Sequence, residues 1–255
     1  MIEVRQNGPV AVVTLARSER RNALTPEMTG ALTGELRHLE AEPACRVIVL
    51  RGAGGHFCSG RELVPAEEQR TLEEVLAFDE RWTDLYRVLD ALRTPTIASV
   101  EGYAVAGGFT LAMACDFVLA EEGARFGALE MANGFPAAIN TVVLAHRALP
   151  RHALELLLSA ETRPAADLVP MGLVNRVVPG AAALEAATAQ LAERLAALDP
   201  TAVQLTKETL RTAQSMPRGE ALTLGKNVNA LLLASGRIDA AGRAFAARKK
   251  DSSSN

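Results

Sequence analysis

The feature that most constrains the fold is an alternation of short β-branched apolar runs with amphipathic helical stripes. Val10–Leu15 (VAVVTL) and Arg46–Leu50 (RVIVL) are typical of buried strands. Between them, Thr25 and Pro26 predict the start of a helix, because threonine is a good N-cap and proline suits the first helical turn. Such alternation over roughly the first 180 residues predicts an α/β core of parallel strands covered by helices.

The same patterns predict the remaining elements. We expect a helix over Met28–Leu39, a helix over Leu72–Leu92, a strand over Thr96–Val100, a short helix after Gly107-Gly108 and a strand over Asp116–Ala120. After Gly180 only helical stripes follow, at Leu184–Leu198, Val203–Leu210, Ala221–Leu233 and Ile238–Ala247. We therefore expect residues 1–180 to form the core and residues 181–255 to form a helical segment that packs on the core or on another subunit.

Charge and composition exclude several functional classes. With 27 Lys and Arg against 30 Asp and Glu, the 255-residue chain has no global basic field for nucleic acid. Its three cysteines lack the spacing of a disulfide framework, no apolar stretch approaches the ~20 residues of a membrane span, and no signal-peptide pattern follows Met1. We therefore expect a cytoplasmic protein without a membrane partner. A local cluster, Arg17, Arg20 and Arg21, forms either an anion site or a solvated basic turn.

Three glycine-containing segments stand out: Arg51–Leu63 (RGAGGHFCSGREL), Glu101–Asp116 (EGYAVAGGFTLAMACD) and Phe126–Pro136 (FGALEMANGFP). In the second, Ala106-Gly107-Gly108 directly precedes a helical run, so backbone N–H groups would point outward at the positive end of the helix dipole. Such a site suits an oxygen that becomes anionic in a transition state. A tight turn whose glycines serve packing explains the same segment, and both interpretations stay open from this segment alone.

Taken together and in order, these segments resemble the signature segments of the enoyl-CoA hydratase/isomerase (crotonase) superfamily. Further similarities extend the resemblance over nearly the whole chain: Ser18–Leu24 (SERRNAL) resembles the family's coenzyme A loop, Met171–Val178 (MGLVNRVV) its GLV-x-x-V element, Leu205–Leu210 (LTKETL) its C-terminal helix and Gly242–Lys249 (GRAFAARK) its ending. The resemblance implies a spiral of ββα units with a helical C-terminal segment, assembled as a trimer or as a hexamer built from two trimers.

The resemblance also implies an acyl-CoA thioester as substrate, with coenzyme A as its only cofactor-like part and no metal. Its carbonyl oxygen would be held by two backbone N–H groups, which carry over to Ser59 and Gly107. The residues that would line the coenzyme A and acyl sites are Arg21, Ala23, Leu24, Phe57, Arg61, Gly108, Thr110 and Phe135.

The acid and base residues decide the reaction. The hydratases of the family carry two glutamates; this chain has the second as Glu130 but Thr110 at the position of the first. Water addition normally divides its proton transfers between two carboxylates, whereas one suffices to move a proton between two carbons of an acyl chain. We therefore expect double-bond isomerisation with Glu130 as the proton shuttle. Hydration, with help from Thr110 or Glu62, and a catalytically weak acyl-CoA binding subunit are the alternatives.

Other chemistries find less support. Cys58 lies beside a proposed N–H donor, but only His56 is near enough in sequence to act as its base, and only if the segment is extended. The histidines and cysteines lack the spacing of a zinc site, and no dinucleotide or phosphate-loop motif is complete. Phe135 and Ile139 lie in a stretch, Gly134–Thr141, where the hydratases usually have more glycine. These bulkier residues either reshape the acyl pocket or fill the core, so the sequence does not define the substrate.

Overall fold

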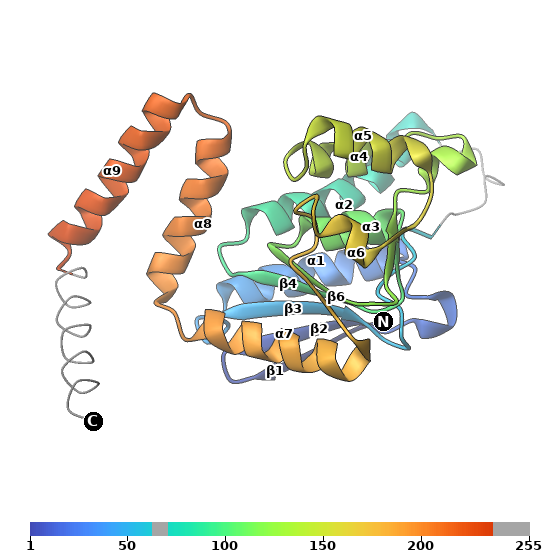
Figure 1. The fold of residues 1–255 in the computed structure, drawn as a ribbon, viewed down its shortest axis with the longest axis horizontal. Coiled ribbons are helices and arrows are strands. Elements are labelled where there is room, and N and C mark those ends of the chain that lie inside the picture. Colours follow the sequence, from blue (N-terminus) through green and yellow to red (C-terminus); the bar gives the residue numbers. More distant parts are fainter. Residues whose placement is uncertain (63–70, 237–255) are drawn as a thin grey trace. The chain divides into compact units, whose positions relative to one another are not determined.

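The computed structural model describes residues 1–62 and 71–236, and it divides the chain into a unit from Met1 to Asp199 and a second unit that begins at Pro200 (Figure 1). The expected helix at Ile238–Ala247 and the terminal Gly242–Lys249 segment lie outside the described residues. None of the described helices is long and apolar enough to cross a membrane.

The first unit contains two sheets. The larger has the strand order β1-β2-β3-β4-β6-β9, in which β1 is antiparallel to β2 and all other neighbours are parallel. Its strands are β1 (Ile2–Asn7), β2 (Val10–Leu15), β3 (Val47–Gly52), β4 (Thr96–Val100), β6 (Phe117–Glu121) and β9 (Arg176–Val178). The smaller sheet has the order β5-β7-β8, formed by β5 (Tyr103–Val105), β7 (Arg125–Gly127) and β8 (Arg163–Pro164).

The helices of this unit are α1 (Pro26–Ala41), α2 (Leu72–Ala91), α3 (Gly107–Ala114), α4 (Ala138–Ala145), α5 (Pro150–Ser159), α6 (Ala165–Leu168) and α7 (Gly180–Ala196), with 3-10 turns η1 (Ser18–Arg20) and η2 (Glu130–Asn133). The expected parallel α/β core is confirmed. The predicted strands and helices of the core agree with the structure to within two residues at their ends, including the N-cap at Thr25, whose hydroxyl accepts from Met28 N–H.

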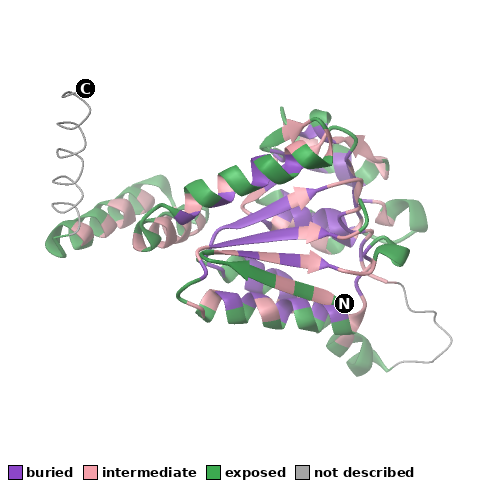
Figure 2. Ribbon diagram, turned by 90° about the horizontal axis from the view of Figure 1, so that it is seen from below, coloured by how far each residue is buried: buried purple, intermediate pink, exposed green. Residues whose placement is uncertain are grey.

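Alternation along the strands divides the core into two apolar layers. Val47 and Val49 of β3 face one side of the large sheet, while Ile48 and Leu50 face the other, because successive side chains of a strand point to opposite faces. The face with Ile48 and Leu50 packs within the larger apolar cluster, which also holds the buried residues of α1, α2 and α3. Figure 2 shows the central strands of the sheet buried between helices, whereas the edge strand β1 is largely exposed. This double cover explains why β3, β4 and β6 read as nearly continuous apolar runs.

The helical segment expected after residue 180 begins with α7, which packs on the core, one of the two partners expected for that segment. Its residues Leu184, Ala187, Ala192 and Ala196 are buried against β3, β4 and β6 and form the second apolar cluster. The reason is that the outer face of the sheet would otherwise expose its apolar side chains to water. The first unit therefore continues to Asp199.

The second unit contains α8 (Pro200–Gln214) and α9 (Arg218–Ala234), which contact each other. Neither helix has a buried residue, and large apolar side chains such as Leu210, Leu222 and Leu231 are exposed. Helices of this kind gain stability mainly from packing of an apolar face. Their expected role in packing and oligomerisation stays a prediction.

Candidate active site

The loop at residues 17–24 is fastened to the end of β3 by a buried asparagine. Asn22 is fully buried, and its side-chain amide donates to the carbonyl oxygens of Ala53 at 2.9 Å and His56 at 2.7 Å. Its Oδ1 accepts from Arg17 N–H at 2.9 Å. Both Arg21 and Asn22 have positive φ values, 50° and 58°, which asparagine tolerates better than most residues. The turn therefore has a conformation fixed by hydrogen bonds to the neighbouring segment.

The segment at residues 58–62 pairs with this loop, and the pairing corrects one expectation. The N–H of Ser59 donates to Arg21 carbonyl oxygen at 3.0 Å, so the predicted donor to the thioester oxygen is already engaged. Leu24 N–H donates to Gly60 oxygen at 2.8 Å and Glu62 N–H donates to Leu24 oxygen at 2.9 Å. In this parallel bridge, the intervening Arg61 directs its own N–H away from the loop. The available donor of the segment is therefore Arg61 N–H, two residues beyond the predicted one.

Gly107 lies beside this segment at the N-terminus of α3. A Cβ added at Gly60 would stand 2.9 Å from Gly107 nitrogen, and one added at Gly107 would stand 3.1 Å from Arg61 nitrogen. Gly60 has a φ of 103°, a conformation that favours glycine, so both sterics and backbone geometry require it here. As the first residue of α3, Gly107 has no carbonyl partner for its N–H within the helix.

The two N–H groups of Arg61 and Gly107 thus lie close together, and neither makes a hydrogen bond within residues 1–62 and 71–236. The positive end of the α3 dipole adds to the field at Gly107. The preceding Ala106 has φ 49° and ψ −126°, a region that a residue with a Cβ rarely occupies. Two neighbouring N–H donors without partners fit an oxygen that gains negative charge during reaction.

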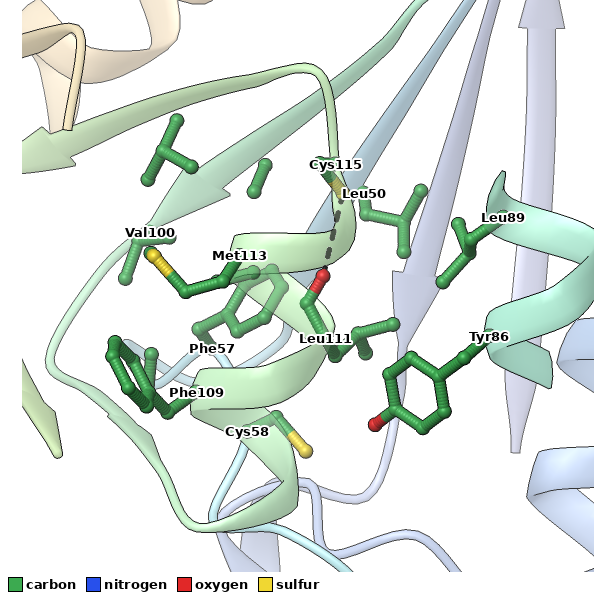
Figure 3. Close-up of a cluster of buried hydrophobic side chains, with 14 of the residues drawn as sticks. Leu50, Phe57, Cys58, Tyr86, Leu89, Val100, Phe109, Leu111, Met113 and Cys115 are labelled. Atoms are coloured by element: carbon green, nitrogen blue, oxygen red, sulfur yellow. Dashed lines mark hydrogen bonds between the residues drawn. The ribbon is translucent and has the colours of Figure 1, made fainter. Parts of the chain in front are cut away.

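Helix α2 closes one side of this pair with aromatic residues. Atoms of the Trp82 ring lie 2.6 and 2.8 Å from the position of a Cβ at Gly107, so the indole packs directly on that glycine. Tyr86 donates its hydroxyl to Gly107 carbonyl oxygen at 3.2 Å. Figure 3 shows Tyr86 reaching from α2 toward α3 and Cys58 within the apolar cluster. Burial raises the pKa of Tyr86 well above 10, so its hydroxyl stays protonated and continues to donate.

Glu130 lies in η2 and is joined to α3 through a residue that the sequence analysis did not single out. Asn140 Nδ2 donates to Glu130 Oε1 at 2.8 Å and to Ala106 oxygen at 3.4 Å. Thr110 Oγ1 donates to Asn140 Oδ1 at 2.6 Å. Glu130 Oε2 is shielded from solvent and has no hydrogen-bond partner among the described residues. One amide therefore connects the Glu130 carboxylate to the peptide group that carries Gly107 N–H.

Burial governs the proton affinity of Glu130. It raises the pKa of the carboxyl above its usual value, and the hydrogen bonds from its own backbone N–H and from Asn140 oppose that rise only in part. A carboxylate with a raised pKa is a stronger base, which suits removal of a weakly acidic carbon-bound proton.

Glu62, the reserve candidate for a second acid, has a different role in the structure. Its Oε1 accepts from Arg17 Nη2 at 2.8 Å, and this hydrogen bond lowers the pKa of the Glu62 carboxyl. A carboxylate that is held ionised by an arginine is a poor proton donor. Arg17 is thus paired with Glu62. The exposed arginines of the predicted coenzyme A loop are Arg20 and Arg21.

The other predicted site residues differ in how far they are buried. Phe57 and Leu24 are fully buried, and Ala23 is half-buried with its carbonyl accepting from Arg17. A Cβ at Gly108 would stand 2.1 Å from Cys58 oxygen, so packing alone explains that glycine. The remaining residue, Phe135, is 38% exposed.

Two further side chains of the predicted site, those of Arg61 and Thr110, are engaged by neighbouring residues. The Arg61 guanidinium lies 3.9 Å from the Phe78 ring centroid and donates to Asp79 at 2.6 Å. Thr110 is 1% exposed and faces Asn140.

A thiol mechanism at Cys58 does not fit the structure. The side chain is fully buried and donates to Asn22 carbonyl oxygen at 3.2 Å, and burial raises its pKa to about 12. Nucleophilic cysteines need a lowered pKa and access to substrate. Within residues 1–62 and 71–236, no group of three or more His, Cys, Asp or Glu residues is arranged to hold a metal ion.

Comparison with known proteins agrees with this geometry. The model of the enoyl-CoA hydratase/isomerase family matches residues 5–252. The chain belongs to this family. It is 39% identical over 247 residues to a Thermus thermophilus protein provisionally named an enoyl-CoA hydratase, covering 96% of this chain and 97% of that protein. It is also 34% identical over 219 residues to the (E)-benzylidenesuccinyl-CoA hydratase of Thauera aromatica, covering 82% and 81%.

The fold is also that of solved members of the family. A crystal structure from Streptomyces coelicolor, provisionally described as an enoyl-CoA hydratase, superposes with a TM-score of 0.90 at 31% identity, covering 97% of this chain and 91% of the other. The crotonase-type fold that the sequence predicted is therefore confirmed, and the protein is an acyl-CoA enzyme of the enoyl-CoA hydratase/isomerase family.

Proposed function

We propose that this enzyme isomerises the double bond of an enoyl-CoA, using Glu130 as its only acid and base and the N–H groups of Arg61 and Gly107 to hold the thioester oxygen. The observation that carries the proposal is the set of partners around Glu130. Its side-chain partner is the neutral amide of Asn140, which is bonded in turn to Thr110, while Glu62 is bound to Arg17. A single unpaired carboxylate supports proton transfer between two carbons more readily than addition of water.

The reaction follows from these positions. Glu130 Oε2 removes a proton from C2 of a 3-enoyl-CoA, and the electron pair of that bond moves toward the carbonyl oxygen. The resulting dienolate oxygen accepts from Arg61 N–H and Gly107 N–H, which stabilise the negative charge. When the carbonyl re-forms, a C2–C3 double bond appears, and the electrons of the former C3–C4 bond take the proton back from Glu130 at C4. The carboxylate is regenerated, the thioester to coenzyme A stays intact, and no cofactor is consumed.

Hydration is the second candidate, because the relatives from Thermus thermophilus and Thauera aromatica are named as hydratases. In that reaction Glu130 would protonate C2 after water adds at C3, and the polar groups of Asn140 and Thr110 would have to hold the water. A threonine hydroxyl titrates far above neutral pH and so cannot deprotonate it. The alternative therefore needs Glu130 to serve both the water and the carbon.

Two substrates separate these candidates and the non-catalytic alternative. Purified protein is incubated with a 3-enoyl-CoA and, separately, with a 2-enoyl-CoA, and the products are followed by chromatography. We expect conversion of the first to the 2-enoyl-CoA without accumulation of a 3-hydroxyacyl-CoA. Rapid formation of the hydroxy product from the second substrate would establish hydration instead. Turnover of neither, together with calorimetric binding of acetyl-CoA, would favour an acyl-CoA binding subunit.

The backbone donors have their own test. Arg61→Ala removes the side chain but keeps the N–H, so turnover is expected to stay within a few-fold of the wild type. Arg61→Pro deletes the N–H and should lower kcat by about 10²–10³-fold if the protein folds. Equal activity of the two variants, with circular dichroism spectra like the wild type, would rule Arg61 N–H out as a donor.

We further propose that coenzyme A binds at the 17–24 loop and that the protein assembles as a trimer or as a hexamer built from two trimers.

A further inference from the structure

Asn140 and Thr110 form a buried polar pair that the proposed reaction does not itself require. Asn140 is 2% exposed and Thr110 is 1% exposed, in a part of the molecule otherwise filled by apolar side chains. Burial of an amide or hydroxyl is unfavourable unless its hydrogen bonds are made. The pair connects α4 to α3 and η2 across 30 and 10 residues of sequence. Its position next to Glu130 calls for an explanation beyond core packing.

The hydrogen bonds of the pair fix the orientation of the Asn140 amide. Its Nδ2 lies 2.8 Å from Glu130 Oε1 and 3.4 Å from Ala106 oxygen, which both accept when Glu130 is ionised. Its Oδ1 lies 2.6 Å from Thr110 Oγ1, a shorter distance than the 3.3 Å from that hydroxyl to Ala106 oxygen. The hydroxyl therefore donates to Oδ1 and holds the amide so that its N–H groups face the carboxylate.

This orientation makes the two oxygens of Glu130 unequal. Oε1 accepts a hydrogen bond from Asn140, whereas Oε2 is shielded from water and has no partner among the described residues. A proton is held less well on an oxygen that already accepts a strong hydrogen bond than on one that accepts none. The amide thus leaves Oε2 as the oxygen that takes up and returns a proton, and it restrains rotation of the carboxylate.

We propose that Asn140, oriented by Thr110, is a positioning residue that fixes Glu130 with Oε2 as the proton-carrying atom. The inference rests on the proposed role of Glu130 as proton shuttle and extends it. In this arrangement the partner of the Glu130 carboxylate is a neutral amide, so the carboxylate has a hydrogen-bond donor next to it in place of a second charge. A shuttle between two carbons needs such a fixed oxygen because it must reach both carbons without turning.

The groups that surround Glu130 allow a pH profile to test the idea. Burial raises the pKa of Glu130, and the bond from Asn140 lowers it. From α2, Tyr86 is electrostatically coupled to Glu130 but keeps its proton, because its own pKa is well above 10. Helix α5 contacts η2 and carries Arg151, His152 and Glu155. None of these three is among the causes of the shift in the pKa of Glu130.

The test compares Asn140→Ala and Thr110→Val with two controls. Thr110→Ser keeps the hydroxyl. Thr33→Val removes a buried helical hydroxyl that, like Thr110, contacts the carbonyl four residues earlier, at Thr29, but lies on α1. For Asn140→Ala we expect kcat to fall at least about tenfold, the size of a lost hydrogen bond to a charged group, with KM within about threefold. The acid limb of the kcat/KM profile should move to higher pH.

Thr110→Val should change kcat and the acid limb in the same direction but by less, while Thr110→Ser and Thr33→Val should behave like the wild type. Glu130→Gln is measured alongside. If Glu130→Gln is inactive but Asn140→Ala and Thr110→Val keep the wild-type kcat and acid limb, the pair is only structural and this inference is wrong while the proposed function stands. If Glu130→Gln is fully active, the proposed function itself fails.

Discussion

Replacing Glu130 by glutamine separates chemistry from binding, because glutamine has the shape of glutamate without its charge. The side-chain carbonyl of glutamine can take the place of Oε1 and accept from Asn140, which donates at 2.8 Å in the wild type. The amide nitrogen then occupies the place of Oε2, an oxygen that is shielded from solvent and has no hydrogen-bond partner within residues 1–62 and 71–236. The variant should therefore fold with the same hydrogen bond to α4 and a locally similar site.

The magnitude follows from what is lost and what is kept. General acid–base catalysis contributes about 10²–10⁴-fold, so kcat should fall by at least about a hundredfold. Binding of the acyl-CoA should change little, since the backbone donors and the 17–24 loop are untouched. An unsatisfied buried amide costs about 1–3 kcal/mol, and removal of a buried charge offsets part of that cost.

The assay measures kcat and KM with a 3-enoyl-CoA and the affinity for acetyl-CoA by calorimetry. We expect the affinity to stay within about threefold of the wild type while turnover is nearly lost. A variant that binds the ligand normally and retains the wild-type isomerase rate would show that Glu130 moves no proton. Loss of binding together with loss of turnover would show that the carboxylate holds substrate, and the argument from its unpaired oxygen would fail.

The pH dependence of stability provides a second test of the raised pKa of Glu130. Because burial raises the pKa of Glu130 above its ordinary value of 4.5, the folded protein holds this proton more tightly than the unfolded chain does. Its contribution to stability is complete below pH 4.5 and is lost as the pH rises through the raised pKa. The difference in Tm between Glu130→Gln and the wild type should therefore shift in favour of the variant from pH 4 to pH 7.

Three further changes test neighbouring parts of the site. Gly107→Ala would place a Cβ 2.6 Å from the Trp82 ring and 3.1 Å from Arg61 nitrogen, so kcat should fall by about 10²-fold, with altered tryptophan fluorescence. Ala106→Gly relieves the positive φ of 49° and should raise the free energy of unfolding by about 1 kcal/mol, measured with urea; an unchanged value would mean that the strain is absent. Glu62→Gln frees Arg17 and should raise KM for acyl-CoA while leaving kcat within about threefold; a loss of kcat at unchanged KM would instead assign Glu62 to the chemistry.

The helices and strands of the core were predictable because burial of one face makes apolar residues recur with the period of the element. The strand Thr96–Val100 was predicted with its observed bounds. A short run of β-branched and small apolar residues is typical of a strand in a sheet that is covered on both faces. The strands β5 and β7 are three residues long, too short to show a period, and were not predicted. Helix α7 packs on the core, one of the two partners expected for the helical segment, but its stripe alone does not reveal which of the two it contacts.

The candidate site was predictable only where sequence position fixes backbone position. Gly107 was found because it begins a helix after a strand, but Ser59 was chosen where Arg61 is the available donor. The difference arises from the direction of one N–H, which depends on the φ of 103° at Gly60 and on pairing with Leu24. Asn140 gave no signal, because its partners lie 10 and 30 residues away and meet it only in the folded chain.

The choice between isomerisation and hydration therefore depends on the space beside Glu130 more than on Glu130 itself. Both reactions need the same enolate and the same pair of N–H donors, so neither Arg61 nor Gly107 distinguishes them. Hydration requires a water held at C3 by a group that can take its proton. The side chain bonded to Glu130 is the amide of Asn140, and that amide is bonded in turn to the threonine Thr110. Their hydrogen bonds are directed at each other and at Glu130. A carboxylate with one oxygen held and one free in a solvent-shielded place is suited to hold a proton from carbon until it returns to carbon.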